Sequence, residues 1–433
     1  MNSLADDASA ADVMPGDGLC ADSFNSCTLR AAIMEANALA GDDFIEFSVT
    51  GTIDLDSAVG PLPSITDYLV IDGTTAPGFN VSGTDIDEAP PVLIIDGQNL
   101  GGSTADGLRF SGAATSFSEI QSIAIRNFPD NGIESINAAD SLIIQGCDLN
   151  GNSDSGIFAL NTDFHVIGRT YGIFTSEFIG RGNLIANNEN AGILLSSSNS
   201  NTLFGNFIGV LADETAAPGN DGNGLTIIGD DNVIGFFDED EIGGNLIGGN
   251  QGHGLRIAGD DNTIYANRIG TGLRPAFFGN AQDGILITGS NNRIGAAAAN
   301  SSNFIANNGR GIAVGSDFSS GFATVIENNR IGISTVALGN TSHGIHVESG
   351  DQLSVINNLV INNGGHGIWI EADDAIVRGN SIGVVGTQRQ GNALNGVFLD
   401  GSSGSIIGGD DPLHSNIIGD NGAPGPPATG GMR

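Results

Sequence analysis

One phrase of four residues recurs along the second half of this chain: a glycine, an aliphatic residue, a variable residue and a second aliphatic residue. Its copies follow one another at intervals of 23 to 33 residues, and they begin at Gly192, Gly224, Gly254, Gly284, Gly311, Gly344, Gly367 and Gly396. A period of this length is typical of a solenoid, in which one repeat cannot bury its apolar face alone and must stack on its neighbours. The repeat therefore predicts an elongated body whose turns share one core.

Each period holds three short strand-like pieces. The glycine phrase is followed by a polar turn and by two pieces of the pattern Asn-x-Ile, as in the stretch from Gly254 to Gly270. Alternation of aliphatic and variable residues places the aliphatic side chains on one face of each strand. The pieces are too short for strand-helix-strand units, and a leucine-rich repeat is excluded because its L-x-x-L-x-L core is missing. We predict an all-β, single-domain parallel β-helix of about 11–13 turns.

Asparagine recurs where the chain must turn sharply between these pieces. Asn tolerates left-handed backbone conformations, and its side chain bonds neighbouring backbone groups. Stacked from turn to turn, such residues form amide ladders. We assign the following residues to the scaffold rather than to chemistry: Asn187, Asn250, Asn267, Asn307, Asn329, Asn362 and Asn380.

The charge of the chain excludes whole classes of partner. Its 433 residues carry 50 acids and 14 bases, a formal net charge of −36, and every base is an arginine. Such a surface repels nucleic acid and anionic membranes, because phosphate binding needs clustered Lys and Arg. No run of 18 apolar residues is present, so no membrane insertion is expected. The acidity has two interpretations: a solvated surface suited to a saline medium, or cation sites in the turns.

The first 43 residues differ from the repeats. A helix is predicted after Thr28, a candidate N-cap, and before Gly41, because apolar residues between them fall at helical spacing. We expect a flexible segment over residues 1–19, a capping module with this helix over 20–43, the β-helix over 44–420 and a flexible linker over 421–433. The N-terminus lacks basic and apolar regions, so a signal peptide is absent from this sequence.

Two of the three cysteines close a small polar loop ahead of the predicted helix. A disulfide between Cys20 and Cys27 would suit an exported protein, whereas zinc is disfavoured because no further Cys or His pair stands nearby. Cys147 lies in an apolar run and is expected to be a buried thiol.

The segment from Cys20 to Asn37 resembles the N-terminal module known by its CSLREA motif. Here the motif reads CTLRAAI, with Ala31 in place of the usual glutamate, so any interaction of that side chain is lost. The resemblance implies an exported or surface-attached bacterial protein with a right-handed β-helix of the pectin-lyase type, capped by this module. A cap is physically required, since an open solenoid end exposes strand edges and core. The group carries no agreed activity, so the resemblance implies no catalytic residue.

The variable third residue of each glycine phrase is expected to face outward, so the phrases align into a surface column. The column ends in three aromatic residues, His346, Trp369 and Phe398. Two further sets fall in register with it. Imidazoles precede the same glycines, at His343 and His366, and carboxylates follow the column, at Glu348, Glu371 and Asp400.

This strip has a functional and a structural interpretation. As a carbohydrate-binding strip, it would pack its aromatic faces on sugar rings, while Glu348, Glu371, Asp400, His343 and His366 serve as weak catalytic candidates. As structure, the aromatic rings would simply stabilise adjacent turns. Like carboxylates one turn apart raise one another's pKa unless water or a cation intervenes.

Paired acids in the turn after the glycine phrase form a second candidate site, for Ca²⁺. The pairs are Asp230 and Asp231, Asp260 and Asp261, and Asp373 and Asp374. Their simpler use is capping of the turns by side-chain hydrogen bonds, which we favour. No cofactor is required by the sequence pattern, and Ca²⁺ is the one candidate.

These observations favour a non-enzymatic extracellular or cell-surface β-helix with a structural, adhesive or self-assembling role. One alternative is a polysaccharide-active enzyme of the pectin-lyase type, either a lyase or a hydrolase. The other is a carbohydrate-binding module that uses the same strip. The expected partners are polysaccharide or copies of the chain itself, and the expected location is secreted or at the cell surface.

Overall fold

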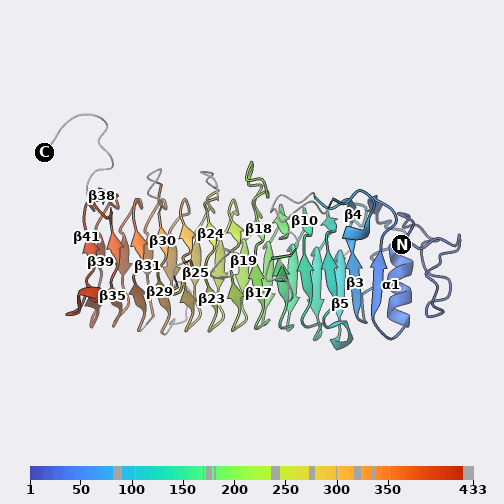
Figure 1. Cartoon of the computed structure of the whole chain (residues 1–433), viewed down its shortest axis with the longest axis horizontal. Helices are drawn as coiled ribbons and strands as arrows, with labels where there is room; N and C mark the ends of the chain where they lie inside the picture. The colour runs from blue at the N-terminus through green and yellow to red at the C-terminus, as the bar shows by residue number, and fades with distance from the viewer. Residues whose placement is uncertain are drawn as a thin grey trace. The chain divides into compact units, whose positions relative to one another are not determined.

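The chain folds into short strands that wind through three parallel sheets. The computed structural model describes residues 1–80, 90–102, 104–168, 170–171, 178–179, 182–235, 244–272, 278–298, 300–315, 323–332, 338–350 and 352–422. Contacts divide the chain into two compact units, Met1–Asn232 and Val233–Arg433. Within each unit, successive strands along the chain fall in different sheets, and each pairs with the equivalent strand one turn away (Figure 1).

The N-terminal unit contains the following elements. The first sheet has β1 (Asp43–Glu46), β3 (Leu69–Asp72), β6 (Glu119–Gln121), β9 (Ile143–Gln145), β12 (Val166–Gly168) and β17 (Thr202–Phe204). The second has β2 (Gly51–Asp54), β4 (Leu93–Asp96), β7 (Ala124–Arg126), β10 (Asp148–Asn150), β15 (Leu184–Ala186) and β18 (Phe207–Ile208). The third has β5 (Leu108–Ser111), β8 (Ile133–Ile136), β11 (Ile157–Leu160), β16 (Ile193–Ser196) and β19 (Leu225–Ile227). Outside these sheets lie α1 (Leu29–Ala38), η1 (Gly73–Thr75), η2 (Ala113–Thr115) and the antiparallel pair β13 (Thr170–Tyr171) and β14 (Phe178–Ile179).

The C-terminal unit repeats the arrangement. The first sheet has β20 (Val233–Ile234), β23 (Thr263–Ile264), β26 (Arg293–Ile294), β29 (Val325–Glu327), β32 (Ser354–Ile356), β35 (Ile376–Arg378) and β40 (Ile406–Ile407). The second has β21 (Leu246–Ile247), β24 (Arg268–Ile269), β27 (Phe304–Ile305), β30 (Arg330–Ile331), β33 (Leu359–Val360), β36 (Ser381–Ile382) and β41 (Ile417–Ile418). The third has β22 (Leu255–Ile257), β25 (Ile285–Ile287), β28 (Ile312–Val314), β31 (Ile345–Val347), β34 (Ile368–Ile370) and β39 (Val397–Leu399). The remaining elements are the antiparallel pair β37 (Val384–Val385) and β38 (Gln388–Arg389), and η3 (Pro412–His414).

This order confirms the predicted fold class, an all-β parallel β-helix with a short N-terminal helix. Parallel strands joined by crossovers wind right-handed. Over the described residues, the first sheet has six strands in the N-terminal unit and seven in the C-terminal unit, in agreement with the expected number of turns. The predicted linker was placed over 421–433, and residues 423–433 lie outside the described ranges.

The glycine phrase builds the third sheet of the C-terminal unit. Its two aliphatic positions are fully buried, as at Ile345 and Val347 of β31, so the alternation of the phrase places the core as predicted. The glycine is needed because the next turn passes very close. A Cβ atom placed on Gly344 would lie 2.6 Å from the carbonyl oxygen of Gly367, far inside van der Waals contact.

Buried asparagines form two amide ladders along the C-terminal unit. In each ladder the Nδ2 of one residue donates to the Oδ1 of its equivalent in the next turn, as between Asn267 and Asn303. The ladders are Asn245–Asn267–Asn303–Asn329–Asn358–Asn380–Asn416 and Asn250–Asn280–Asn308–Asn340–Asn363–Asn392–Asn421. Three asparagines assigned to the scaffold instead occupy left-handed turn positions, with φ of 56° to 67°: Asn187, Asn307 and Asn362.

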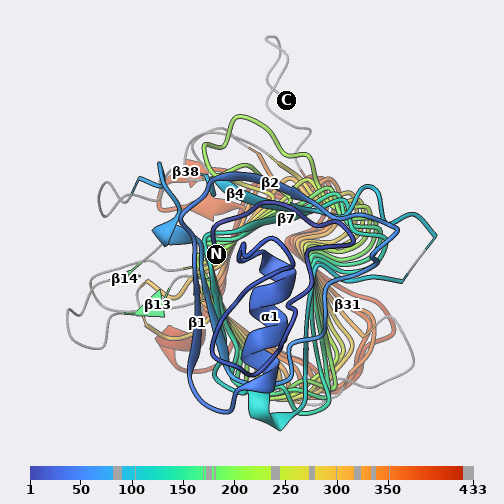
Figure 2. The same ribbon diagram turned by 90° about the vertical axis from the view of Figure 1, so that its right-hand side faces the viewer.

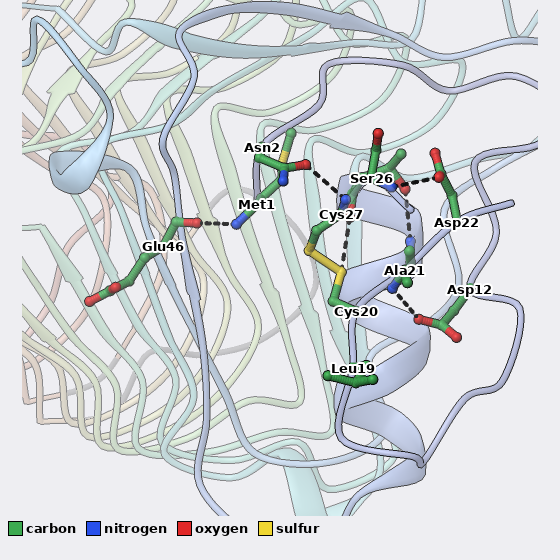
Figure 3. Close-up of a disulfide and its surroundings, with 12 residues drawn as sticks. Met1, Asn2, Asp12, Leu19, Cys20, Ala21, Asp22, Ser26, Cys27 and Glu46 are labelled. Carbon is green, nitrogen blue, oxygen red and sulfur yellow. Dashed lines mark hydrogen bonds between the residues drawn. A yellow bond between two sulfur atoms is a disulfide. The ribbon is translucent and has the colours of Figure 1, made fainter. Parts of the chain in front are cut away.

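The helix α1 closes the first turn of the N-terminal unit. Thr28 caps it by accepting a hydrogen bond from the Ala31 amide at 3.0 Å, and its apolar side chains are buried. Viewed along the coil, α1 lies across the end of the turn between the sheets (Figure 2). Cys20 and Cys27 form a disulfide beside it, and the Cys27 amide donates to Asn2 at 2.8 Å (Figure 3). Cys147 is a buried free thiol.

Candidate functional site

The predicted aromatic column lies on the third sheet of the C-terminal unit. His346 of β31, Trp369 of β34 and Phe398 of β39 are paired in register on consecutive turns. Side chains alternate along each strand, so the flanking aliphatic residues point into the core and these three side chains point away from it. The strip predicted from the phrase is therefore assembled by the fold.

The column is less open than the sequence suggests. Only 6% of His346 is exposed, while Trp369 and Phe398 are half-buried. Two earlier members of the column, Leu286 and Ala313, are also buried. The expectation of a continuous surface column is wrong for these positions. At His346, the side chain of Arg310 from the preceding turn lies against the ring.

The rings pack into one aromatic cluster: His343, His346, His366, Trp369 and Phe398. The His346 ring stacks on Trp369 at 4.1 Å, and the His366 ring stacks on Phe398 at 4.6 Å. His343 and His366 stack on each other at 5.3 Å, and His343 meets Trp369 edge-on at 4.8 Å. Trp369 Nε1 is buried and finds no hydrogen-bond partner within the described part of the chain. The imidazoles thus fill the spaces between the aromatic residues of adjacent turns.

A charged network runs beneath and beside this cluster: Asp283, Arg310, His346, Glu348 and Glu371. Arg310 donates to both carboxylate oxygens of Asp283, at 2.8 and 2.9 Å, and it also bonds Glu348. Nη1 of Arg310, which bonds Glu348, also lies 2.9 Å from His346 Nδ1. His346 Nε2 lies 2.8 Å from Glu371 Oε1. Since arginine can only donate, Nδ1 of His346 accepts and Nε2 carries the proton.

Hydrogen bonds from the backbone fix the tautomers of the other histidines. Nδ1 of His343 accepts from the amide of His366 at 2.9 Å, and Nδ1 of His366 accepts from the amide of Asn395 at 3.2 Å. Each neutral ring therefore holds its proton on Nε2. Neither Nε2 is bonded to, or buried by, any residue that the structure describes. Both rings consequently offer an N–H donor to solvent rather than a lone pair.

Burial and neighbouring charges keep these imidazoles neutral. Burial lowers the pKa of His343 to about 4, with help from the charges of His346, His366 and Arg310. Burial, then His346, also lowers the pKa of His366. At neutral pH both rings are uncharged, which suits close stacking between them.

Burial and hydrogen bonding have opposite effects on the pKa values of Asp283 and Arg310. Burial by itself would raise the pKa of Asp283, but the hydrogen bonds from His253 and Arg310, together with the charge of Arg310, hold it well below its usual range. Burial would lower the pKa of Arg310, and its bonds to Asp283 and Glu348 raise it instead. The pair therefore stays ionised.

The three predicted carboxylates fall on successive turns, as expected. The amides of Glu348, Glu371 and Asp400 each donate to the strand of the preceding turn, at 3.0, 2.8 and 2.9 Å. Glu348 bonds Arg310 and Glu371 bonds His346, whereas Asp400 is exposed. Two of the three thus have cationic or donor partners that relieve their mutual repulsion.

Arg310 and Asp283 are residues of the candidate site that the sequence analysis did not single out. Both stand immediately before a phrase glycine, as do His253, His343 and His366. That shared position was the available signal. It places one side chain per turn at the edge of the third sheet, so charges from several turns can meet there.

The paired acids proposed for Ca²⁺ lie in exposed turns. Asp231, Asp261 and Asp374 have left-handed backbones, with φ of 57°, 57° and 53°. Their partners cap the next turn: Asp260 accepts from the Ser290 amide at 2.6 Å, and Asp373 accepts from the Ser403 amide at 2.7 Å. Turn geometry accounts for these acids, and a calcium role stays a prediction.

Within the described ranges, no three His, Cys, Asp or Glu side chains are placed to hold a metal ion together. Across the same residues, no helix has the length and apolar character needed to cross a membrane.

The comparisons with known proteins concern the fold. A model of the family described as "Periplasmic copper-binding protein (NosD)" matches residues 82–272. Among solved structures, the chain is similar to the A-module of mannuronan C-5 epimerase AlgE6 of Azotobacter vinelandii, with 14% identity, a TM-score of 0.48, and coverage of 87% of this chain and 94% of that one. It is also similar to the catalytic domain of a GH87 α-1,3-glucanase, with 13% identity, a TM-score of 0.43, and coverage of 96% and 70%. None of the curated protein sequences matches this chain.

Proposed function

We propose that the C-terminal unit binds a polysaccharide at the aromatic cluster. The observation that carries this proposal is the half-exposed pair Trp369 and Phe398, in register on adjacent turns and flanked by the Nε2–H donors of His343 and His366. Aromatic faces pack against the apolar faces of sugar rings, and polar tips nearby bond the hydroxyl groups. The turns repeat every ~4.8 Å, so the surface suits a ligand that also extends along one axis.

The acidic side chains around the cluster favour one class of glycan over another. Four carboxylates surround the cluster, namely Asp283, Glu348, Glu371 and Asp400, and Arg310 is the cation in the network. That cation is already paired with two carboxylates, so it is a poor partner for a uronate. Like charges across a binding surface disfavour association. A neutral or amino-bearing polysaccharide therefore fits better than a uronate polymer.

The proposed setting is outside the cytoplasm. The disulfide between Cys20 and Cys27 is of the kind that persists in oxidising compartments. The matched family model carries the word periplasmic in its description. We do not propose copper binding for this chain, because the only histidines in the matched range are His165 and His253. His165 is buried and bonded at both ring nitrogens, to Leu142 and Thr162.

Fluorescence tests the binding proposal directly, because Trp369 is the only tryptophan. Neutral and amino-sugar oligosaccharides are titrated into the protein in parallel with uronate oligosaccharides. A saturable change in Trp369 emission with the former, and none with uronates, is expected. Phe398→Ala should weaken binding about tenfold or more, as expected for the loss of a hot-spot ring. Phe164→Ala, at an exposed ring of the N-terminal unit, is the matched control. Unchanged emission with every glycan rejects the proposal.

Catalysis on the bound glycan is a second candidate, favoured by one observation. Glu348 and Glu371 stand one turn apart and have different partners, Arg310 and His346. Paired carboxylates with unequal environments are what glycoside hydrolysis requires. Release of reducing ends from a glycan that binds, abolished by Glu371→Gln with binding retained, would support an enzyme. Binding without turnover supports the non-enzymatic adhesive role.

A further inference from the structure

Two exposed phenylalanines mark one corner of the N-terminal unit, where the chain passes from the third sheet to the first. Phe117 precedes β6 and Phe164 precedes β12, and their side chains are 67% and 59% exposed. The register of β6, β9 and β12 places Phe117, Ser141 and Phe164 at equivalent positions of consecutive turns. The two phenylalanines are therefore two turns apart along the coil, about 9.6 Å, with a small side chain between them.

Both phenylalanines have backbones in the left-handed region. Their φ angles are 71° and 63°, and this conformation is unfavourable for a bulky side chain. Apart from glycine, the other left-handed positions among the described residues hold Asn, Asp, Ser, Ala, Gln or Glu. The neighbouring turns follow that rule, with Ser141 and Ser200 at the equivalent positions. An aromatic residue that strains the backbone and exposes apolar surface, twice at one corner, indicates a function rather than packing.

Two carboxylates belong to the same corner. Asp140 directly precedes the intervening serine, and Asp163 directly precedes Phe164. One oxygen of each accepts a hydrogen bond from an amide of the next turn: Asp140 Oδ1 from Asp163 at 2.9 Å, and Asp163 Oδ1 from Asn199 at 2.6 Å. Within the described residues, no arginine pairs with either carboxylate and neither Oδ2 is bonded. Each Oδ2 is therefore available to accept a hydrogen bond from a ligand.

This corner lies inside the coil of the N-terminal unit rather than at an end of it. The segments that join the third sheet to the first there are residues 112–118, 137–142, 161–165 and 197–201, and all of them lie within the described ranges. They are short, and they leave both rings exposed. The surface is thus formed by consecutive turns of the chain itself.

The size and pattern of this surface favour a glycan over a protein partner. Together the two rings offer roughly 250 Å² of apolar surface, whereas a standard protein interface buries about 800 Å² per partner. The rings are also separated by polar residues rather than joined in one patch. A sugar chain has the matching pattern, because its apolar ring faces alternate with hydroxyl groups. The carboxylates, which lack a cation partner among the described residues, disfavour an anionic glycan.

We propose that this corner binds a neutral, extended β-1,4-linked polysaccharide along the coil axis. In such a chain each sugar is turned over relative to the one before, so every second sugar presents the same face. Each sugar is also about as long as the spacing between turns. Phe117 and Phe164 pack against alternate sugars. Asp140 and Asp163 accept hydrogen bonds from hydroxyl groups along the edge of the chain. The site shares no residue with the aromatic cluster of the C-terminal unit.

Calorimetric titration of the full chain with cellohexaose, a β-1,4-linked glucose oligomer, tests the proposal. A saturable heat is expected, and it should persist in Phe398→Ala, which weakens the aromatic cluster. Adding Phe117→Asn with Phe164→Asn should raise the dissociation constant about 30-fold or more. Asparagine adopts a positive φ readily, so this variant should melt no lower than its parent. Phe24→Asn, at an exposed ring of the capping module, is the matched control.

Two further measurements separate this site from the aromatic cluster and define the shape of its ligand. Emission from Trp369 reports only ligand beside that ring, so substitutions at Phe117 and Phe164 should leave the Trp369 titration unchanged. Maltohexaose, an α-1,4-linked chain that coils, should give no heat that depends on the two phenylalanines.

Three results would overturn the proposal. They are the absence of heat with cellohexaose, an affinity that the double Asn substitution does not reduce, and equally tight binding of maltohexaose at the two phenylalanines. Binding at the aromatic cluster is judged separately, by Trp369 emission.

Discussion

At the scale of single residues, Arg310 is the side chain that links buried Asp283 to the aromatic cluster. It contacts Asp283 on one neighbouring turn, and His346 and Glu348 on the other. Because Asp283 is only 5% exposed, its ionisation depends on that guanidinium. The ion pair with Asp283 thus holds the Arg310 side chain where it can bond His346.

Replacement of Arg310 tests this dependence. Arg310→Met keeps the aliphatic stem but leaves the Asp283 carboxylate buried without its cation. We expect the free energy of unfolding to fall by about 3 kcal/mol. Adding Asp283→Asn should restore a large part of the loss, since the stranded charge is removed. Urea denaturation of both variants measures the effect, and equal stabilities for them would contradict the argument.

The depressed pKa of His343 predicts a dependence of stability on pH. Its folded pKa of about 4 lies below the unfolded value of about 6.5, so the unfolded state binds the extra proton. Stability is therefore full above pH 6.5 and declines as the pH falls toward 4. Partial exposure reduces the effect to about 1–2 kcal/mol. Buried His165, whose pKa is also about 4, acts in the same window.

His343→Asn is the matched variant for this prediction. Asn131 stands at the same position of its turn, and its Oδ1 accepts from the Ser155 amide at 3.2 Å. The substitution therefore keeps the acceptor and removes the titrating ring. Unfolding free energies measured from pH 7 to pH 4 should decline less steeply than in the wild type. An identical slope would show that His343 does not contribute.

At the scale of the strand and turn, the amide ladders are the main polar element of the core. Asn303 lies in the middle of one ladder and is fully buried. Its Nδ2 donates to Asn329 at 2.9 Å and to the Ile264 carbonyl at 2.8 Å. Each turn is thereby bonded to its neighbours through side chains as well as through strands.

Substitution within a ladder should be costly. Asn303→Ala removes the acceptor of the Asn267 backbone amide and the donor to Asn329 Oδ1. An unsatisfied buried group costs about 1–3 kcal/mol. We expect a loss of about 3 kcal/mol or more by urea denaturation. Asn307→Gly provides the control, since Asn307 has a φ of 67° that glycine adopts readily. Comparable losses in the two variants would refute a special role for the ladder.

The fold and the strand register could be predicted from the sequence, but the burial of individual side chains could not. The glycine phrase predicts the three-sheet coil, and the register of Trp369 with Phe398 follows from counting residues within each phrase. The burial of His346 could not be predicted, because it depends on the side chain of Arg310 reaching it from the adjacent turn. Alternation gives the direction of a side chain but not what covers it.

At the scale of the whole molecule, charge dominates behaviour in solution. A net charge of −36 destabilises a compact state through self-repulsion. Sodium chloride should therefore raise the melting temperature by several degrees between low and physiological ionic strength. Sucrose is the control, because it stabilises folded proteins in general but does not screen charge. A melting temperature that does not depend on salt would show that the acids are already compensated.

A comparison of two divalent salts distinguishes calcium binding from the screening of charge. If the acidic turns hold Ca²⁺, calcium chloride should raise the melting temperature more than magnesium chloride at equal ionic strength. Asp260→Asn with Asp261→Asn should reduce the difference. Identical curves for the two salts would leave these residues as turn formers alone.

The buried ladders also bear on how such a chain can change in length. Along each ladder the side-chain amides bond from one turn to the next, so residues 284–310 form one module between successive phrase glycines. Removing that module would rejoin Asn267 to Asn329 and Asn280 to Asn340, so both ladders stay continuous. Duplication or deletion of whole modules therefore keeps the ladders continuous, and its cost falls on contacts between turns that do not repeat, such as the pair Arg310 and Asp283.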